Sequence, residues 1–414
     1  MLLLRKSVTP LLPIVERARL ISSGHTTTVE VGQGGRLIID MAKAAAEVKV
    51  TTKWIEKCSL AVFRVPAGAD GPPVDERGTN EPSLTLSVNM AQTKLTLAHD
   101  PERAEDGWEG KYLVEAVVPE LFSVDLRVLQ GRVSVGKKLK GDCQIQLDTG
   151  DITVGTVRGE TIRLSTGSGS VDVDELEGNV DITAIGDVRA RLVNGAKVAI
   201  DTAGNGEPSV IVGALYSSGA RITSAGNVGV SSCHGRIAVH TAGAAGSIDL
   251  CSVNGIAQVA TGVCIGGATI HMDVLEEGTA SSIRSDGGDV KVTLSRQVDA
   301  DVEIGADSVE LPSVFEGEAE GGRAMGRIHC AAAETSRATP YGSMSSNSGD
   351  AGGKIDLVGA RGQSLRQYFP SDAATNSKIP KVSISAKGGS VGVEILSWAD
   401  NIARKFLARE AKPG

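Results

Sequence analysis

The stretches Gly150–Val154 (GDITV) and Gly169–Val173 (GSVDV) decide the fold of this chain. Each contains a glycine, a polar residue, an aliphatic residue, any residue, and a small or aliphatic residue. Glycine permits the positive φ of a tight corner, and the polar residue is expected to hydrogen-bond the turn. The remaining residues alternate as they do in a strand, so Ile152 and Val154 are predicted to face an interior and Thr153 to face water.

The same signature recurs along the middle of the chain. Further copies are Gly131–Val135, Gly178–Ile182, Gly186–Ala190, Gly226–Val230, Gly235–Val239, Gly246–Leu250 and Gly288–Val292, with weaker copies at Gly353–Leu357 and Gly389–Val393. Short strands at such intervals suit either a sandwich or a solenoid. The self-similarity sustained from Gly131 to Val292 favours a solenoid, in which each rung buries its apolar row on the next.

The scarcity of aromatic residues supports the same interpretation. Aromatics make up 3% of the chain, and Tyr216 is the only one between Ser123 and Val314. A conventional globular core of that length would use several large rings, because each ring buries a large area. The middle section is therefore predicted to have a core of stacked Val, Ile, Leu and Ala.

The fold class expected from these patterns is all-β. We predict a single-stranded-type β-solenoid of irregular Gly-rich repeats, with an N-terminal β region and a C-terminal capping helix. The expected boundaries are 1–24 for a mitochondrial transit peptide, 25–122 for the N-terminal β region, 123–333 for the solenoid, 334–353 for a flexible Ser/Gly-rich loop, and 354–414 for the last strands and the capping helix.

Both end regions contain recognisable elements. Alternation and β-branching predict N-terminal strands at Thr27–Val31, Arg36–Asp40, Val48–Thr52, Leu60–Val65, Ser83–Val88, Lys94–Ala98 and Tyr112–Val118. At the other end, Ser397–Glu410 is predicted to be an amphipathic helix, since Trp398, Ile402 and Phe406 recur at helical spacing. Such a helix would cover the unpaired strand edges of a solenoid end.

The first 24 residues differ in charge from the rest of the chain. Met1–Gly24 contains four basic residues and a single acid, Glu16. Arg and Ser with few acids are typical of a mitochondrial transit peptide, and Arg19–Ser23 resembles a matrix-protease cleavage region. Pro10 and Pro13 weaken the helix that such a peptide should form. The expected location is the mitochondrial matrix, with a cytoplasmic protein that has an ordinary N-terminus as the alternative.

The overall composition excludes several partners. The net charge of −8 argues against nucleic acid or an anionic membrane as the main partner, because phosphate binding needs a basic face. No apolar run is long enough to span a membrane, and six cysteines in so long a chain are too dilute for a disulfide scaffold. The expected partner is a protein, and the oligomeric state stays open.

The Gly-Asp-Val/Ile runs, together with Asn194-Gly195 and Asn254-Gly255, resemble the "putative adhesin" β-solenoid domain of unknown function. The resemblance covers roughly Tyr112 to Leu311 and points to a eukaryotic branch of mitochondrial-looking proteins. It implies a stacked β-solenoid with no established catalytic residues. A fold-level label of this kind does not establish an activity.

The best metal constellation in the sequence is Cys233, His234 and His240, with Cys251, Cys264 and His271 on neighbouring repeats. Sulfur and imidazole are ligands that zinc and copper prefer. The spacing matches no known site, and buried cysteines commonly act as small hydrophobes. We therefore expect no cofactor, and these residues are weak metal candidates only.

Two functions remain open on the sequence. The first is a non-enzymatic interaction or scaffold protein. The alternative is a carbohydrate-binding or polysaccharide-cleaving β-helix, with carboxylates on its outer face. The carboxylates that could serve it are Asp148 with Asp151, Asp172 with Asp174 and Glu175, and Asp286 with Asp289. Alternation already places polar residues at these positions, and the groove of a sugar enzyme would normally offer aromatic rings, so the scaffold is favoured.

Overall fold

The computed structural model describes residues 16–19, 26–30, 34–55, 57–65, 84–88, 94–99, 110–136, 138–204, 206–243, 246–262, 266–296, 298–320, 322–328, 379–396, 400 and 403. Within these ranges the chain forms twenty-two strands, which backbone hydrogen bonds join into one sheet. The prediction of an all-β chain is confirmed.

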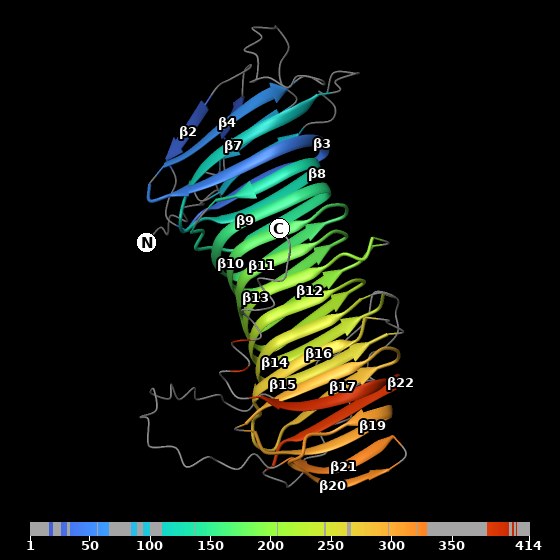
Figure 1. Ribbon diagram of the computed structural model, residues 1–414. Helices are drawn as coiled ribbons and strands as arrows, with labels where there is room; N and C mark the ends of the chain where they lie inside the picture. Colours follow the sequence, from blue (N-terminus) through green and yellow to red (C-terminus); the bar gives the residue numbers. More distant parts are fainter. Residues whose placement is uncertain are drawn as a thin grey trace, which may run out of the picture.

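Most of the strands are stacked in parallel along one long axis (Figure 1). The central part consists of β8 (Ser123–Val135), β9 (Cys143–Thr166), β10 (Val171–Ala184), β11 (Val188–Asn194), β12 (Lys197–Thr202), β13 (Val210–Ser224), β14 (Val228–Thr241), β15 (Ile248–Thr261), β16 (Ala268–Val274), β17 (Ala280–Ser285) and β18 (Val290–Ser295). Each turn of the chain lies on the preceding one, and the long strands bend so that they contribute to more than one face.

The register explains why the repeat has an irregular spacing. Ile152 pairs with Val133 on one side and Val171 on the other. Val180, from a second copy of the signature in the same strand β10, pairs instead with Ile162 and Val198. The signature thus occurs at two different positions of one turn, and its copies form two separate columns.

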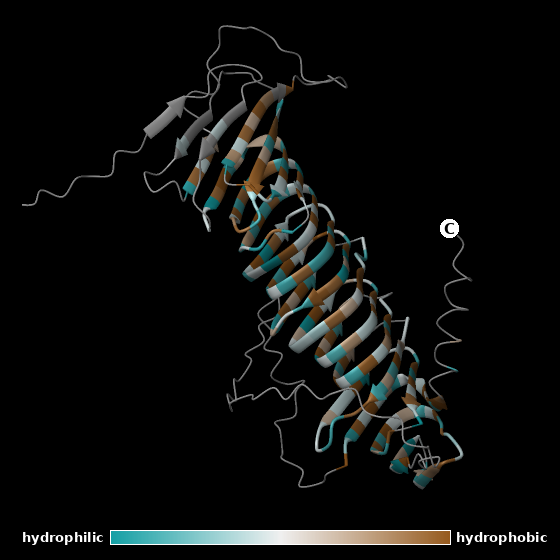
Figure 2. Cartoon of the chain, turned by 90° about the vertical axis from the view of Figure 1, so that its left-hand side faces the viewer, coloured by the Kyte–Doolittle hydropathy of each residue, from teal (hydrophilic) through white to brown (hydrophobic). Residues whose placement is uncertain are grey.

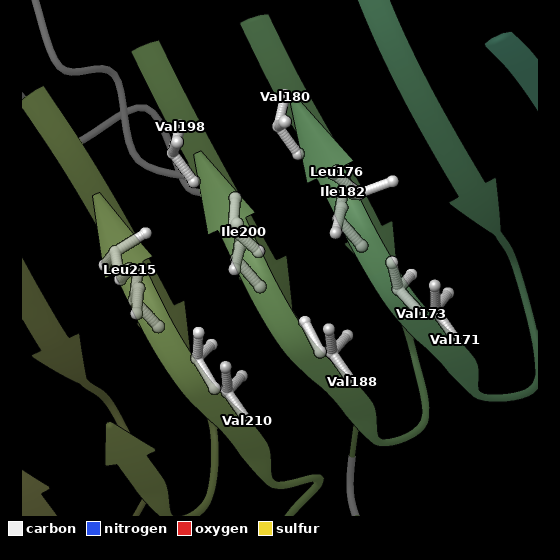
Figure 3. Close-up of a cluster of buried hydrophobic side chains, with 14 of the residues drawn as sticks. Val171, Val173, Leu176, Val180, Ile182, Val188, Val198, Ile200, Val210 and Leu215 are labelled. Atoms are coloured by element: carbon white, nitrogen blue, oxygen red, sulfur yellow. The ribbon is translucent and has the colours of Figure 1, made fainter. Parts of the chain in front are cut away.

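The hydrophobic core of the stack is aliphatic, as predicted. Figure 3 shows inward-pointing side chains that repeat from turn to turn, such as Val171, Val188 and Val210 in one row. Between Ser123 and Val314 the described hydrophobic core contains only aliphatic residues, cysteine and methionine, while Tyr112 and Phe122 are buried at the N-terminal end. Hydrophobic and hydrophilic residues alternate along the strands in the side view (Figure 2).

A column of buried hydroxyl groups, which the repeat signature does not indicate, runs through the same interior. The Thr202 hydroxyl donates to Ser224 Oγ at 2.9 Å, and Ser224 donates in turn to the Pro208 carbonyl at 2.9 Å. Three turns later, Thr261 donates to Ser285 Oγ at 2.9 Å, and Ser285 donates to the Gly287 carbonyl at 2.6 Å. Ser224 and Ser285 thus donate hydrogen bonds to the backbone carbonyls of two corners.

The polar residue of the signature bonds to the next turn of the chain, where a bond within its own turn was expected. Asp151 Oδ1 accepts a hydrogen bond from the Ser170 backbone N–H at 2.9 Å. Three further pairs repeat this bond one turn apart: Asp187 with Ser209, Asn227 with Ser247, and Asp289 with Ser390. The signature therefore encodes a bond between turns as well as a corner.

At the N-terminal end the stack continues into the first region of the chain. The elements there are β1 (Glu16–Arg19), β2 (Thr26–Glu30), β3 (Arg36–Lys53), β4 (Lys57–Val65), β5 (Leu84–Val88), β6 (Lys94–His99) and β7 (Lys111–Pro119). Strand β3 pairs in parallel with β8 on one side and with β6 and β7 on the other. Strands β4 and β2, and β5 and β1, complete this end in antiparallel pairing.

The predicted N-terminal strands are confirmed, with one difference. Arg36–Asp40 and Val48–Thr52 belong to the single long strand β3, which bends around Ala42–Ala45 instead of ending there. Glu16–Arg19, within the segment 1–24, forms β1 against β5.

The described part of the C-terminal end consists of strands. It contains β19 (Ala300–Glu310), β20 (Phe315–Glu320), β21 (Arg323–Ile328) and β22 (Lys381–Leu396). Strand β21 pairs antiparallel with β19 and with β20, while β22 carries the late signature copy Gly389–Val393. The segments 334–353 and Gly353–Leu357 lie outside the described residues, as does the predicted helix Ser397–Glu410 apart from Asp400 and Ala403.

Candidate functional site

One outward-facing column of side chains, which we call the Tyr216 face, combines charge, aromatic rings and amides. Neighbouring members pair in register from turn to turn, so each lies about 4.8 Å from the next. The members are Arg158, Glu177, Asn194, Tyr216, His234, Asn254 and Val274.

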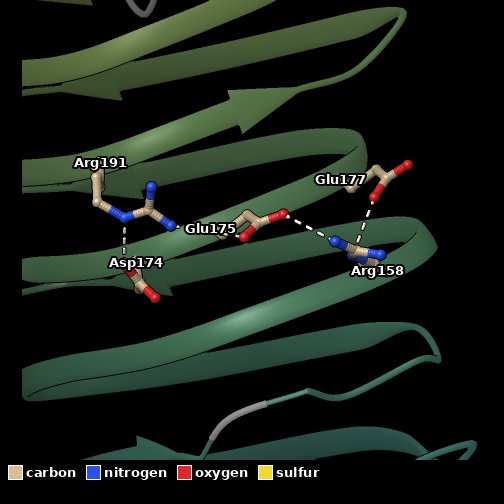
Figure 4. Close-up of polar contacts among 5 residues, drawn as sticks. All are labelled: Arg158, Asp174, Glu175, Glu177 and Arg191. Atoms are coloured by element: carbon tan, nitrogen blue, oxygen red, sulfur yellow. Dashed lines mark hydrogen bonds and ion pairs between the residues drawn. The ribbon is translucent and has the colours of Figure 1, made fainter.

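Arg158 and Glu177 of the Tyr216 face belong to a network of ion pairs with the neighbouring residues Asp174, Glu175 and Arg191 (Figure 4). Arg158 contacts Glu175 at 3.2 Å and Glu177 at 3.1 Å. Arg191 contacts Asp174 at 2.5 Å and Glu175 at 3.5 Å, so Glu175 joins the two arginines across three turns. The hydrogen bond to Asp174 raises the pKa of Arg191 above its usual range. Single exposed ion pairs contribute little, but a network that spans several turns fixes these side chains in place.

The next members of the Tyr216 face toward the C-terminus carry amide groups and aromatic rings. The rings of Tyr216 and His234 are stacked, with centroids 4.8 Å apart and an angle of 11° between their planes. Tyr216 is 43% exposed, although the hydrophobic core of the surrounding stack contains no Phe, Tyr or Trp among the described residues. The Asn254 amide lies 3.5 Å from the His234 ring nitrogens. The sequence shows that Tyr216 is the only aromatic residue between Ser123 and Val314, but it does not show which way the ring points. The ring points outward because the alternation of buried and exposed side chains shifts by one residue between Val212 and Leu215.

The structure does not bring the metal candidates Cys233, His234 and His240 together. Cys233 points inward between Leu215 and Val253, and burial raises the pKa of its thiol to about 12. A metal binds the thiolate, which such a pKa disfavours at neutral pH. His234 points outward, and His240 lies on another part of the turn, where burial lowers its pKa. Among the described residues no group of three or more metal-ligating side chains is present.

The other residues named with them are also dispersed. The thiol of Cys251 lies 3.5 Å from Asp249 Oδ1, and Cys264 lies outside the described residues. His271 Nε2 lies 2.8 Å from Asp273 Oδ1, and the Ser252 hydroxyl donates to the second oxygen of that carboxylate. The carboxylate therefore separates the hydroxyl from the imidazole, whereas a nucleophilic triad needs the imidazole beside the hydroxyl.

Most of the candidate acid/base carboxylates are engaged in structural contacts. Asp289 accepts hydrogen bonds from the Ser390 N–H at 2.9 Å and from its hydroxyl at 2.7 Å, and these bonds lower the pKa of Asp289. Asp286 pairs with Arg284 at 3.0 Å. Asp174 and Glu175 belong to the arginine network, and Asp151 bonds to Ser170. A general acid needs a raised pKa, which is the opposite of the shift at Asp289.

A shallow hollow at the C-terminal end is lined by charged residues that pair with one another. Arg327 contacts Asp301 at 2.7 Å, and Lys381 contacts Glu303 at 2.9 Å. Glu316 also lines the hollow and interacts with Arg327, so three carboxylates stand beside two cations and neither charge is in large excess.

Another exposed aromatic stands apart from the Tyr216 face. Trp54, just after β3, is 76% exposed, and Lys140 Nζ lies 5.8 Å from the centroid of its ring. Among the described residues no helix is both long and apolar enough to cross a membrane.

Comparison with known proteins gives little further information. No family model and no curated protein matches the sequence. Among solved structures, a chain described as a "putative cell adhesion protein" from Clostridium sporogenes is similar at 9% identity and a TM-score of 0.18, over 90% of this chain and 100% of that chain. A likeness of that TM-score carries no argument about the role of this chain.

Proposed function

We propose that this protein is a non-enzymatic interaction or scaffold protein, built as a single-stranded-type β-solenoid, and that the Tyr216 face binds a partner protein in the mitochondrial matrix. The parallel register from β8 to β18 supports the solenoid, because successive turns repeat the same pairing. A rigid stack of this kind presents side chains at fixed spacings, which limits the entropy lost on binding.

The observation that carries this proposal is the exposure of Tyr216. Its ring lies at the surface, stacked on His234, while the core beneath it is aliphatic. Tyrosine and arginine are enriched among the residues that dominate protein interfaces, and the Tyr216 face presents both. The engagement of Asp174, Glu175 and Asp289 in structural contacts supports a binding role over an enzymatic one.

Substitution of Tyr216 tests the proposed face. Partners captured by the full chain would be compared between wild type, Tyr216→Ala and Ile211→Ala. Ile211 is 47% exposed on the same strand β13 but stands in a different column, so it is the matched control. A partner that is lost with Tyr216→Ala and retained with Ile211→Ala supports the proposal. Equal capture by all three proteins contradicts it.

The proposed location has a separate test. Deleting residues 1–23 would also remove β1, which pairs with β5, so charge variants are a cleaner choice. Arg5→Glu with Lys6→Glu reverses the charge outside β1 and should abolish import if the segment is a transit peptide. Unchanged distribution of the tagged chain, or a cytoplasmic wild-type chain, would refute the matrix location.

A second candidate function is binding of a carbohydrate at the same face. Tyr216 and His234 form a flat, partly apolar strip, and the amides of Asn194 and Asn254 flank it one turn to either side. Stacked rings beside amide groups can contact the C–H face and the hydroxyls of a sugar ring. Glycan binding that Tyr216→Phe retains and Tyr216→Ala loses would favour this candidate, and an absence of binding across a broad glycan array would exclude it.

A further inference from the structure

The last turns of the stack are assembled out of sequence order. Strands β18 and β19 are consecutive in the chain and are joined by residues 296–299, yet each pairs with β22. In Figure 1 the red strand β22 lies between the strands β17 and β18 above it and β19 below it. We call the space that β22 fills between these strands the β22 slot.

The β22 slot recognises its strand by backbone register and by charge. β22 pairs in parallel with β17 through Lys381–Ala386 and with β18 through Val391–Leu396. Across the slot, Lys291 Nζ contacts Glu394 at 2.7 Å, and Lys381 Nζ contacts Glu303 at 2.9 Å. The N–H and hydroxyl of Ser390 both donate to Asp289. The two ion pairs and the serine bond therefore define one register.

The interior side of the slot is apolar. Val382, Ile384 and Val391 of β22 are at most 3% exposed, and they lie in register with buried residues of the flanking strands, such as Ile283 and Val302. Side chains of a strand alternate between its two faces, so a shift of one residue would turn this apolar row outward. The slot is thus selective for the sequence of β22.

The order of the chain leaves the slot to be filled last. Residues 329–378 separate β21 from the slot strand, and a chain of that length reaches roughly 160 Å when extended. At the opposite end, β3 lies between β7 and β8 but precedes both in the sequence, whereas β7 lies between β3 and β4 and follows both. At the C-terminal end the flanking strands β17, β18 and β19 can therefore all form while β22, the strand between them, is still absent.

We propose that the β22 slot is a strand-acceptor site that binds β22 from a second copy of this chain. When two chains exchange their β22 strands, each slot receives the same backbone hydrogen bonds, ion pairs and apolar side chains that its own strand would supply. The two chains then form a closed symmetric dimer. Within one chain the tether holds β22 near its own slot at an effective concentration on the order of 1 mM or less, so exchange increases with chain concentration during folding.

The test uses two full-length chains that each carry one new cysteine, in a background where Cys251, Cys264 and Cys330 are serine. One chain has Lys291→Cys and the other has Gly392→Cys; these residues pair directly across β18 and β22. A Cβ atom added at Gly392 meets nothing within 4 Å. The chains are unfolded, mixed, refolded at increasing concentration and treated with a short bifunctional thiol cross-linker. The measurement is the fraction of cross-linked mixed dimer.

Two controls make the result decisive. Replacing Gly392→Cys by Ser383→Cys puts the thiol opposite Ser282 and Glu303, away from Lys291, and should give no mixed product. One chain with both Lys291→Cys and Gly392→Cys should cross-link within itself. Exchange predicts a mixed product that rises about tenfold for a tenfold rise in concentration before saturating. Its absence while the double variant cross-links internally, or equal yield with Ser383→Cys, overturns the proposal.

Discussion

At the scale of the residue, the bond between turns is made by a carboxylate whose ionised form the fold stabilises. The backbone N–H of Ser209, with a smaller effect from its hydroxyl, lowers the pKa of Asp187. The stabilisation is therefore complete above the unfolded-state pKa of about 3.9 and is lost as the pH falls through the lower folded-state value. Asn227 makes the equivalent bonds to Ser247 without a titrating group, so it serves as a natural control.

We expect Asp187→Asn to retain most of the stability at pH 7 and to reduce its dependence on pH below about 4. Asp187→Ala should lower the free energy of unfolding at pH 7 by about 1 kcal/mol, because the Ser209 N–H loses its acceptor. Denaturant unfolding of the three proteins between pH 3 and 7 measures both effects. Parallel pH profiles for wild type and Asp187→Asn would contradict the assignment.

A glycine of the signature is required where successive turns approach each other most closely. Gly150 has a φ of +131°, and a Cβ added there would collide with the Gly131 carbonyl of the preceding turn. Gly150→Ala is therefore expected to lower the free energy of unfolding by about 2 kcal/mol or more. Gly392→Ala, which meets no atom within 4 Å, should change it by less than about 0.5 kcal/mol. Chemical denaturation of the two variants compares them directly.

At the scale of the element, the sequence predicts which residues form strands better than it predicts which strands pair with each other. The alternation in Gly389–Val393 predicts that Val391 and Val393 point inward, and both are buried. Nothing in that local pattern indicates that Val391 pairs with Val290, because the pairing is set by contacts between distant parts of the chain. For the same reason the sequence does not predict that β3 lies between β7 and β8. It also does not predict the arginine network, because the partners in that network come from different turns.

Strand β20 is the outermost strand of the described C-terminal end and pairs there with β21. Its exposed side chains include Glu316, Glu318 and Glu320. Charges on an edge strand oppose the addition of a strand from another molecule. We expect Glu318→Val with Glu320→Val to increase self-association, measured by light scattering against concentration. The control, Glu276→Val with Glu277→Val, removes the same charge from exposed positions outside any strand and should remain dispersed.

At the scale of the whole molecule, stability should be distributed as a sum of contacts between neighbouring turns. Each turn in the centre pairs only with the one before and the one after, as Ile200 does with Ile182 and Ile222. In such quasi-one-dimensional folds a local defect weakens its own turn and the adjoining interfaces. The ends, where β3 and β22 each lie between strands from other parts of the sequence, are the regions in which the chain departs from this simple order.

Replacement of one central core residue tests this distribution. Ile200 is fully buried, and Ile200→Ala should lower the stability of its region by about 2–5 kcal/mol. Amide hydrogen exchange should accelerate in β10, β12 and β13, while β3 and β19 keep their wild-type rates, because opening spreads through neighbours. Ile283→Ala, near the opposite end, should confine the faster exchange to β15, β17 and β22. Uniform acceleration in both variants would instead show that the stack unfolds as one cooperative unit.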